Sequence, residues 1–160
     1  MNWTEFGVQW LHILLGTFWF GGMLFSNYVV IPAIAQVPPE ARGAAMAAVG
    51  RQANRILPWV AVGTIVLGIV RGTALGDIKA VADLGTTYGI EWLIGLVAAV
   101  ATLAWGLWVL NPVAARLAIG PPSPAKAAEM SKVRSYALIQ MAGFLVIFTT
   151  MILMHYASEG

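Results

Sequence analysis

The chain has 160 residues, of which 59% are apolar, and its formal net charge is +2. Only 10% of the residues are charged, against roughly 25% in a soluble domain. A soluble protein of this length cannot bury so much apolar surface. The chain has no cysteine, which excludes disulfides and thiolate metal sites. The basic excess comes from short loops and predicts no nucleic-acid binding.

Charged side chains are absent from four stretches of the chain, residues 6–39, 56–70, 92–115 and 135–158. A helix that crosses a bilayer needs about 20 mostly apolar residues. Three stretches exceed that length, and the second reaches it if the long side chain of Arg71 extends to the membrane surface. We therefore predict an all-α fold, a single transmembrane domain that forms a four-helix bundle. Its spans are expected at about 6–31, 56–74, 88–110 and 136–156.

The N-terminal stretch is not predicted to be a cleavable signal. It has no basic residue before its apolar part, which is also longer than the 7–15 or so residues of a signal-peptide core. We therefore expect it to remain as the first span.

Basic residues gather in two of the three loops between the predicted spans. The first and third loops hold seven of the nine: Arg42, Arg51, Arg55, Arg116, Lys126, Lys132 and Arg134. Such loops face the cytoplasm. We therefore expect both termini and the 75–87 loop to lie outside the cell, with the protein in the inner (plasma) membrane of a bacterium.

Both basic loops contain a proline pair, at residues 38–39 and 121–122, followed by alanine-rich sequence. Proline is favoured in the first turn of a helix, and Ser123 can cap the second of these helices. Spans two and four are therefore predicted to extend into the cytoplasm as helices. A shift of 83 residues superposes the proline pairs and also Arg51 on Arg134, which hints at a two-plus-two internal repeat.

The only two histidines of the chain lie in the first and last predicted spans. His12 follows Trp10, and His155 precedes Tyr156. Because aromatic rings mark the membrane interface, both imidazoles are expected at similar depth in the outer half of the bundle. Ionisable residues within spans usually face the bundle interior. Two imidazoles on facing helices are suitable axial ligands for iron, so we predict a b-type haem held by both.

Small and apolar residues share helix faces with these histidines. Gly16 and Trp19 lie one and two turns from His12, and Met151 lies one turn from His155. These residues are predicted to form the slot for the haem ring.

Three charged residues near the outer interface are candidates for roles around the ring. Arg71 and Lys79 can reach the two carboxylates of a haem that point outwards. Glu91 begins span three, where a carboxylate is favoured by the helix dipole. It could alternatively orient an imidazole by accepting its second N–H.

Other interpretations of the same residues remain open. A histidine near a helix end often only donates a hydrogen bond between helices, and glycines often only allow close helix packing. Four methionines add thioethers that suit Cu(I): Met23, Met141, Met151 and Met154. A copper-handling membrane protein is therefore one alternative, and a cofactor-free structural subunit is another.

The stretch "LHILLGTFWFGGMLF", a later proline, and "GRQANR" before "VAVGTIVLGIVRG" resemble the integral-membrane domain of the copper-resistance protein D family. The same residues are similar to the HemJ-type protoporphyrinogen oxidases, which share the Leu-His pair and a Trp-x-Gly-Gly pattern or a variant. The resemblance covers about residues 8–75. It implies a helical bundle with a functional His12, a position associated with haem in the HemJ-type enzymes. Those enzymes carry a functional basic residue in a later span, and residues 92–110 contain none.

The combined prediction is a membrane b-type haem protein. With both axial positions filled by protein, electron transfer is favoured over oxygen chemistry, which needs an open position. The expected partners are the lipid bilayer, quinol or a periplasmic redox protein, and a second copy of the chain. Nothing in the sequence resembles a Ser/His/Asp triad, and no catalytic residue is predicted.

Overall fold

The computed structural model describes residues 2–117 and 124–157, and all regular structure within these ranges is helical. In the first half, α1 (Trp3–Phe25) continues through the π-helical segment η1 (Ser26–Val30) into α2 (Ile31–Ile34), and α3 (Pro39–Gly72) follows. A loop with the short 3-10 helix η2 (Val81–Gly85) leads to the second half. There α4 (Thr87–Trp105) continues through the π-helical segment η3 (Gly106–Leu110) into α5 (Asn111–Leu117), and α6 (Pro124–Ala157) follows.

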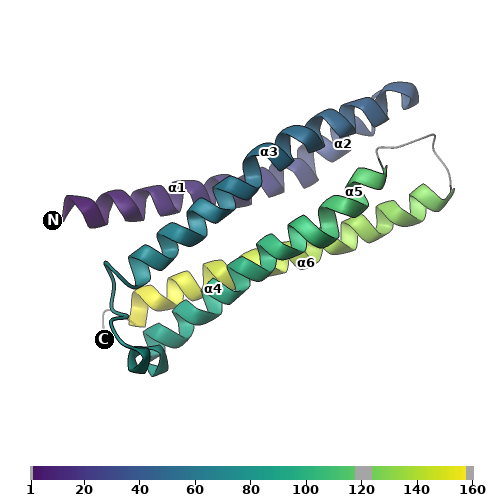
Figure 1. Cartoon of the computed structure of the whole chain (residues 1–160). Coiled ribbons are helices and arrows are strands. Elements are labelled where there is room, and N and C mark those ends of the chain that lie inside the picture. The colour runs from purple at the N-terminus through teal and green to yellow at the C-terminus, as the bar shows by residue number, and fades with distance from the viewer. Residues whose placement is uncertain (1, 118–123, 158–160) are drawn as a thin grey trace.

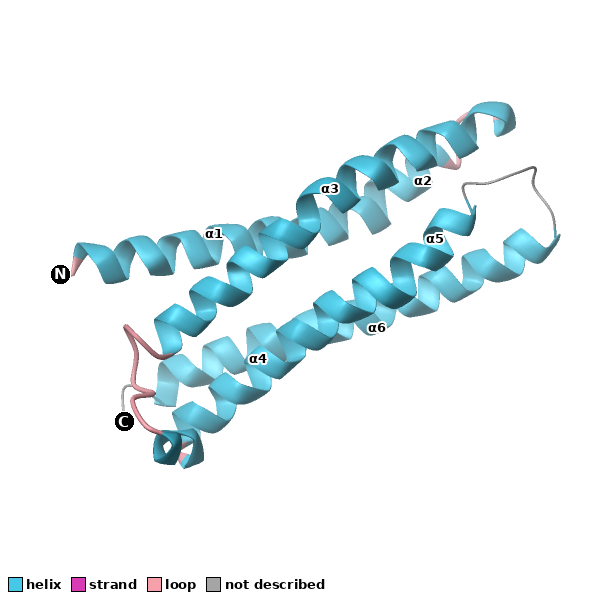
Figure 2. Ribbon diagram, viewed as in Figure 1, coloured by secondary structure: helices cyan, strands magenta, loops and turns pink. Residues whose placement is uncertain are grey.

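The helices form two antiparallel hairpins that lie side by side. The first pairs α1 with α3 and the second pairs α4 with α6 (Figure 1). The start of α1, the end of α6 and the loop around η2 lie at the same end of the bundle (Figure 2). Four helical rods are long and apolar enough to cross a membrane: Trp3–Ile34, Pro39–Gly72, Thr87–Leu117 and Glu129–Tyr156. The predicted all-α four-helix membrane bundle is confirmed.

Spans one and three are longer than the sequence pattern indicated. The first begins at Trp3, because the side chain of Asn2 accepts a hydrogen bond from the backbone N–H of Thr4 and caps the helix. It then runs through Pro32 to Ile34, and span three runs through Pro112 to Leu117. A proline lacks the N–H of an ordinary helix position. In both rods a π-helical segment directly precedes the proline-containing turn.

The predicted helical extensions of spans two and four are present. Both α3 and α6 have 34 residues, which corresponds to about 51 Å at 1.5 Å per residue. That length exceeds the hydrocarbon core of about 30 Å, so each helix protrudes from the membrane. Residues 121–122 and Ser123 lie outside the described residues.

The two halves correspond in the order of their elements. The π-helical segments begin at Ser26 and Gly106, a shift of 80 residues rather than the 83 that superposes the proline pairs. The structure describes α6 from Pro124 onwards, directly after residues that lie outside the described ranges.

Small residues bring the helices of each hairpin close together. A β-carbon at Gly63 would lie 2.9 Å from Cδ1 of Leu15, and one at Gly95 would lie 2.8 Å from Oγ1 of Thr150. Association through small residues is typical of membrane helices. Lipid provides no hydrophobic attraction between helices, so close van der Waals packing has to hold them together.

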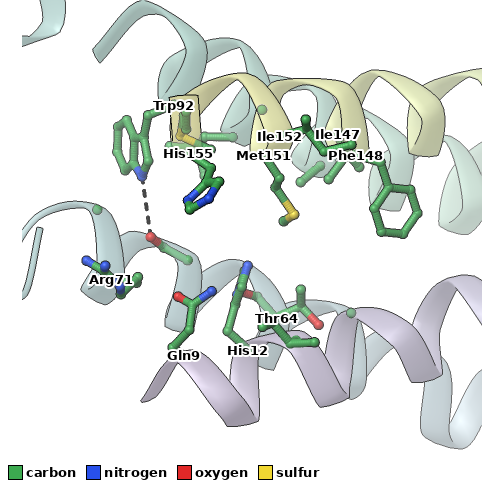
Figure 3. A pocket seen from close by; sticks show the side chains of 18 of the residues that line it. Gln9, His12, Thr64, Arg71, Trp92, Ile147, Phe148, Met151, Ile152 and His155 are labelled. Atoms are coloured by element: carbon green, nitrogen blue, oxygen red, sulfur yellow. Dashed lines mark hydrogen bonds between the residues drawn. The ribbon is translucent and has the colours of Figure 1, made fainter. Parts of the chain in front are cut away.

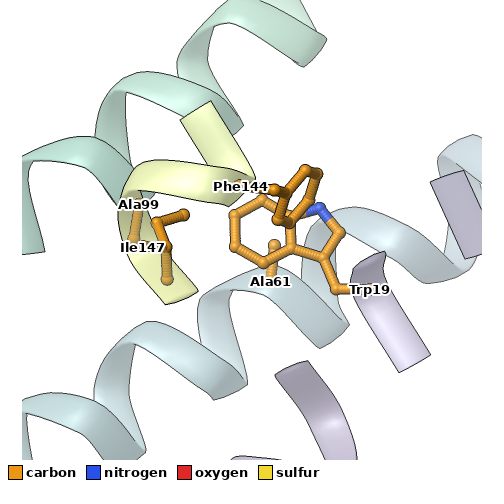
Figure 4. Packing of buried hydrophobic residues seen from close by; sticks show 5 residues of the cluster. All are labelled: Trp19, Ala61, Ala99, Phe144 and Ile147. Carbon is orange, nitrogen blue, oxygen red and sulfur yellow. The ribbon is translucent and has the colours of Figure 1, made fainter. Parts of the chain in front are cut away.

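The two hairpins meet through larger side chains at mid-height. A cluster of five buried residues forms this core (Figure 4): Trp19, Ala61, Ala99, Phe144 and Ile147. The rings of Trp19 and Phe144 pack edge to face with centroids 4.8 Å apart. The core divides the space between the hairpins into two cavities, one on each side of it.

Candidate functional site

The larger cavity lies between the hairpins on the side of the core nearest to the chain termini, and we call it the His cavity. Its volume is about 510 Å³, and all four long helices contribute to its walls. It is lined by all six residues that the sequence suggested for the site: His12, Gly16, Trp19, Arg71, Met151 and His155. The fold therefore brings these residues, from three different helices, around one space.

His12 is held by a backbone contact from the neighbouring helix α3. Its Nδ1 atom lies 2.9 Å from the carbonyl oxygen of Thr64. Because a carbonyl oxygen only accepts, Nδ1 carries the proton and donates. In the neutral ring the lone pair then belongs to Nε2, which is the arrangement of a histidine ready to bind a metal.

The Thr64 carbonyl is accessible to His12 because Gly68 stands one turn further along α3. In a helix a side chain covers the turn on its N-terminal side. A β-carbon at Gly68 would lie 3.0 Å from Cε1 of His12, so even a methyl group would press on the ring. Gly16 contributes from the other helix, since its β-carbon would lie 3.5 Å from Cγ2 of Thr64.

Trp92 of α4 uses the next turn of α3 in the same way. Its Nε1 donates to the carbonyl oxygen of Gly68 at 3.3 Å (Figure 3). A β-carbon at Gly72 would overlap the indole of Trp92. The rings of His12 and Trp92, which come from different hairpins, therefore contact two successive turns of α3. Glycines leave the backbone of these turns accessible.

The sequence interpretation missed Thr64, Gly68, Gly72 and Trp92, although all four line the His cavity. The spacing Gly68-x-x-x-Gly72 was visible as a close-packing pattern of membrane helices. It did not reveal which rings would lie on it.

His155 and Met151 enter the cavity from α6, on the opposite wall from His12 (Figure 3). His155 lies in the last turn of α6 and its side chain is exposed. Met151 and Met154 also line the cavity. Met23 lines the other cavity, and Met141 lines neither.

The mouth of the cavity carries polar groups. Arg71 lines it and donates from Nη1 to the carbonyl oxygen of Leu75 at 3.2 Å. Gln9, Asp77 and Tyr88 line the cavity as well. A carboxylated ligand at this mouth would therefore meet the guanidinium group of Arg71, the neutral hydrogen-bonding groups of Gln9 and Tyr88, and the opposing negative charge of Asp77.

Two charged residues that the sequence suggested for roles around the ring do not line the cavity. Lys79 does not line the cavity; its Nζ donates to the carbonyl oxygens of Thr73 and Ala74, at 2.9 and 3.0 Å. Carbonyls at the end of α3 attract a cation. Glu91 also lies outside the lining, so it does not orient His12, a role that the Thr64 carbonyl fills.

The described residues contain no group of three or more His, Cys, Asp or Glu side chains that could hold a metal ion. Metal binding in the His cavity would therefore rely on the two imidazoles, thioethers and ligands supplied by a cofactor. Comparison with protein-family models, with curated proteins and with solved structures gave no match to this chain.

Proposed function

We propose that this integral membrane protein binds one b-type haem in the His cavity, with His12 and His155 as axial ligands, and transfers electrons. The observation that carries the proposal is the hydrogen bond from Nδ1 of His12 to Thr64. It leaves Nε2 as the metal-binding atom of a ring that lines the same cavity as His155.

The cavity fits such a cofactor in size and in chemistry. Its volume of about 510 Å³ lies within the range of roughly 300–1,000 Å³ for cofactor sites. Its walls are mainly apolar, as a flat macrocycle requires. An iron held in a porphyrin needs only one or two ligands from the protein, and the two histidines supply that number.

The chain's own residues would divide the work of holding and insulating the group. Arg71 would bind a carboxylate of the porphyrin at the mouth. Trp19 and Phe144 would close the inner end of the cavity and exclude water there. The haem, when bound, supplies a one-electron couple whose potential depends on the axial ligands and on burial.

Further parts of the proposal concern location and partners. The proposed location is a bacterial plasma membrane with both termini outside the cytoplasm, an orientation that the basic loops support. The His cavity would then open towards the outer surface. Quinol or a periplasmic redox protein is the proposed electron partner.

A visible spectrum of the purified protein tests the proposal. We expect a Soret band, and sharp α and β bands after reduction. His12→Ala and His155→Ala should each abolish the low-spin spectrum. Leu11→Ala and Leu153→Ala, which truncate exposed neighbours of the two histidines, should leave it unchanged. A low-spin spectrum that persists in His155→Ala would overturn bis-histidine ligation, and the double variant with Met151→Ala would then test a thioether ligand.

Copper handling is the second candidate, because Met151 and Met154 line the cavity together with both histidines. Thioether and imidazole groups suit Cu(I). Colourless protein with stoichiometric copper would support this candidate against haem. Protein with neither haem nor metal would support a structural subunit. Conversion of a porphyrinogen to a porphyrin would support the HemJ-type activity.

A further inference from the structure

A second cavity lies on the other side of the core, and we call it the amide cavity. Its volume is about 150 Å³, so it is much smaller than the His cavity. Four amide side chains line it: Asn27, Asn54, Asn111 and Gln140. Trp19 is the one described residue that lines both cavities.

Two of the four long helices depart from regular α geometry beside this cavity, and a third contains a proline there. Residues of both π-helical segments line it, η1 in the first rod and η3 in the third. Pro58, inside α3, lines it as well. Isolated π turns occur frequently at functional sites. Irregularities from separate helices that converge on one cavity indicate a site built for a ligand.

Among the described residues that line the cavity, one buried side-chain atom lacks a partner, and it is an acceptor. Gln140 is only 4% exposed, and its Oε1 is buried without a hydrogen-bond partner among the described residues. Pro58 has no N–H, so the carbonyl of Asn54 lacks the donor that a regular helix would provide. A buried acceptor without a partner is unfavourable, and a ligand that donates would relieve it.

Three of the four amide side chains around the cavity already donate a hydrogen bond. Nδ2 of Asn27 donates to the carbonyl oxygen of Met23 at 2.9 Å, and Nδ2 of Asn111 donates to Oδ1 of Asn54 at 2.8 Å. Nε2 of Gln140 is directed at the carbonyl oxygen of Thr102, at 3.5 Å. A ligand would therefore gain more from donating hydrogen bonds than from accepting them.

The remaining walls restrict the ligand further. None of the described residues that line the cavity is charged, and most are apolar. These walls suit a ligand that is neutral, largely apolar and able to donate a hydrogen bond, as a hydroxyl group does. The volume suits one ring and is far below that of the His cavity.

We propose that the amide cavity binds the hydroxylated ring of a quinol, and that the Gln140 side chain turns towards it so that Oε1 accepts one of its hydroxyl groups. The inference rests on the proposed function for its physiological role, since a quinol here would lie across Trp19 from the His cavity. Binding itself does not depend on haem. The oxidised quinone carries only acceptors at these positions, so the reduced form should bind more tightly.

Anaerobic titration of the purified full chain with a decyl-substituted benzoquinol and with its quinone tests the site. We expect the quinol to bind at least tenfold more tightly than the quinone. Gln140→Leu should weaken quinol binding at least tenfold, whereas Gln52→Leu, the same change at an exposed position of α3, should have no effect. Gly50→Leu offers a second variant, because Gly50 lines the cavity and no atom lies within 4 Å of its β-carbon position. It should fold and block the site.

Each contrary outcome has a distinct meaning. Equal affinity for quinol and quinone, or unchanged binding in both cavity variants, would overturn the inference. So would equally tight binding of dodecanol, which has a hydroxyl group but no ring. A haem spectrum without quinol binding would refute this site and leave the proposed function standing. Quinol binding by protein without a haem spectrum would support this site and refute the proposed haem function.

Discussion

The imidazole of His12 donates from Nδ1 to the carbonyl oxygen of Thr64, across 52 residues of sequence and from one helix to the next. The contact requires that α3 present an uncovered carbonyl inside a membrane bundle. A side chain at position 68 would cover that carbonyl, and Gly68, which has none, leaves it accessible. The tautomer of His12 is thus determined by a glycine that never bonds to it.

Gly68→Ala should therefore weaken the cofactor site without disrupting the helix. Its methyl group would lie 3.0 Å from Cε1 of His12 and would displace the ring from Thr64. Loss of such an orienting contact costs roughly 10–100-fold in metal affinity, so we expect at least a tenfold faster loss of haem to an acceptor protein. The control is Gly21→Ala, whose β-carbon has no neighbour within 4 Å. Equal haem retention in both variants would contradict the role assigned to Gly68.

Phe144→Ala should loosen the contact between the hairpins. Phe144 is 2% exposed and packs against Trp19 and Phe20, with ring centroids 4.8 and 5.1 Å apart. Truncation of a buried phenylalanine costs about 3–5 kcal/mol in soluble cores. We expect about 3 kcal/mol here, because in lipid mainly the packing term is lost. Unfolding of purified protein by a denaturing detergent measures it, with Phe18→Ala, at a 53% exposed position, as the control that should stay near wild type.

Acid should destabilise the loop that joins the two hairpins. The Asp83 carboxylate accepts hydrogen bonds from the backbone N–H groups of Lys79 and Ala80, at 2.8 and 2.7 Å. These two bonds hold the pKa of Asp83 below its ordinary value of 3.8, against a small opposing effect of burial. A carboxyl group with a lowered pKa stabilises the fold above its unfolded pKa, and that stability is lost as the pH falls through the folded pKa.

Hydrogen exchange at the Lys79 and Ala80 amides provides the measurement. After correction for intrinsic exchange rates, protection should be constant above about pH 5 and should fall below pH 3.8. Asp83→Asn should reduce protection already at neutral pH, whereas Asp77→Asn in the same loop should preserve it. Protection that is independent of pH between 5 and 2.5 would show that the carboxylate does not organise the loop.

The absence of cysteine makes membrane orientation directly testable. A single cysteine at Ala82, in the loop between the hairpins, should react with a membrane-impermeant maleimide in intact cells. A cysteine at Ala41, near the start of α3, should react only after the cells are permeabilised. Both positions are exposed in the structure. The reverse labelling pattern would show that the basic loops face outwards, contrary to the positive-inside rule.

Local properties of the chain made much of the fold predictable. Spans two and four and their extensions from Pro39 and Pro124 followed from charge-free stretches, proline positions and alanine-rich sequence. The ends of spans one and three were underestimated, since a proline usually stops a helix and the π turns before Pro32 and Pro112 were not foreseen.

Only part of the candidate site could be predicted from the sequence, for a different reason. The six suggested residues could be chosen by depth and helix face, since these follow from helix periodicity. Lys79 was suggested as a partner of a haem carboxylate, whereas in the structure its Nζ donates to the carbonyl oxygens of Thr73 and Ala74, a contact that the sequence did not indicate. The contacts of His12 and Trp92 with the backbone of α3 depend on how the helices cross. No local sequence pattern encodes that crossing.

By itself, the sequence determined that four apolar helices cross a membrane and that both histidines lie near one end. A charge in lipid is energetically costly, and the backbone N–H and C=O groups of a span must form their hydrogen bonds within the helix. Both constraints act on contiguous residues. Only the tertiary structure decided which atoms meet: His12 with Thr64, Trp92 with Gly68, and Trp19 between two cavities. Those contacts join residues that are far apart in the sequence. Whether they form depends on the residue at each helix crossing, because a glycine there permits a contact that a larger side chain would prevent.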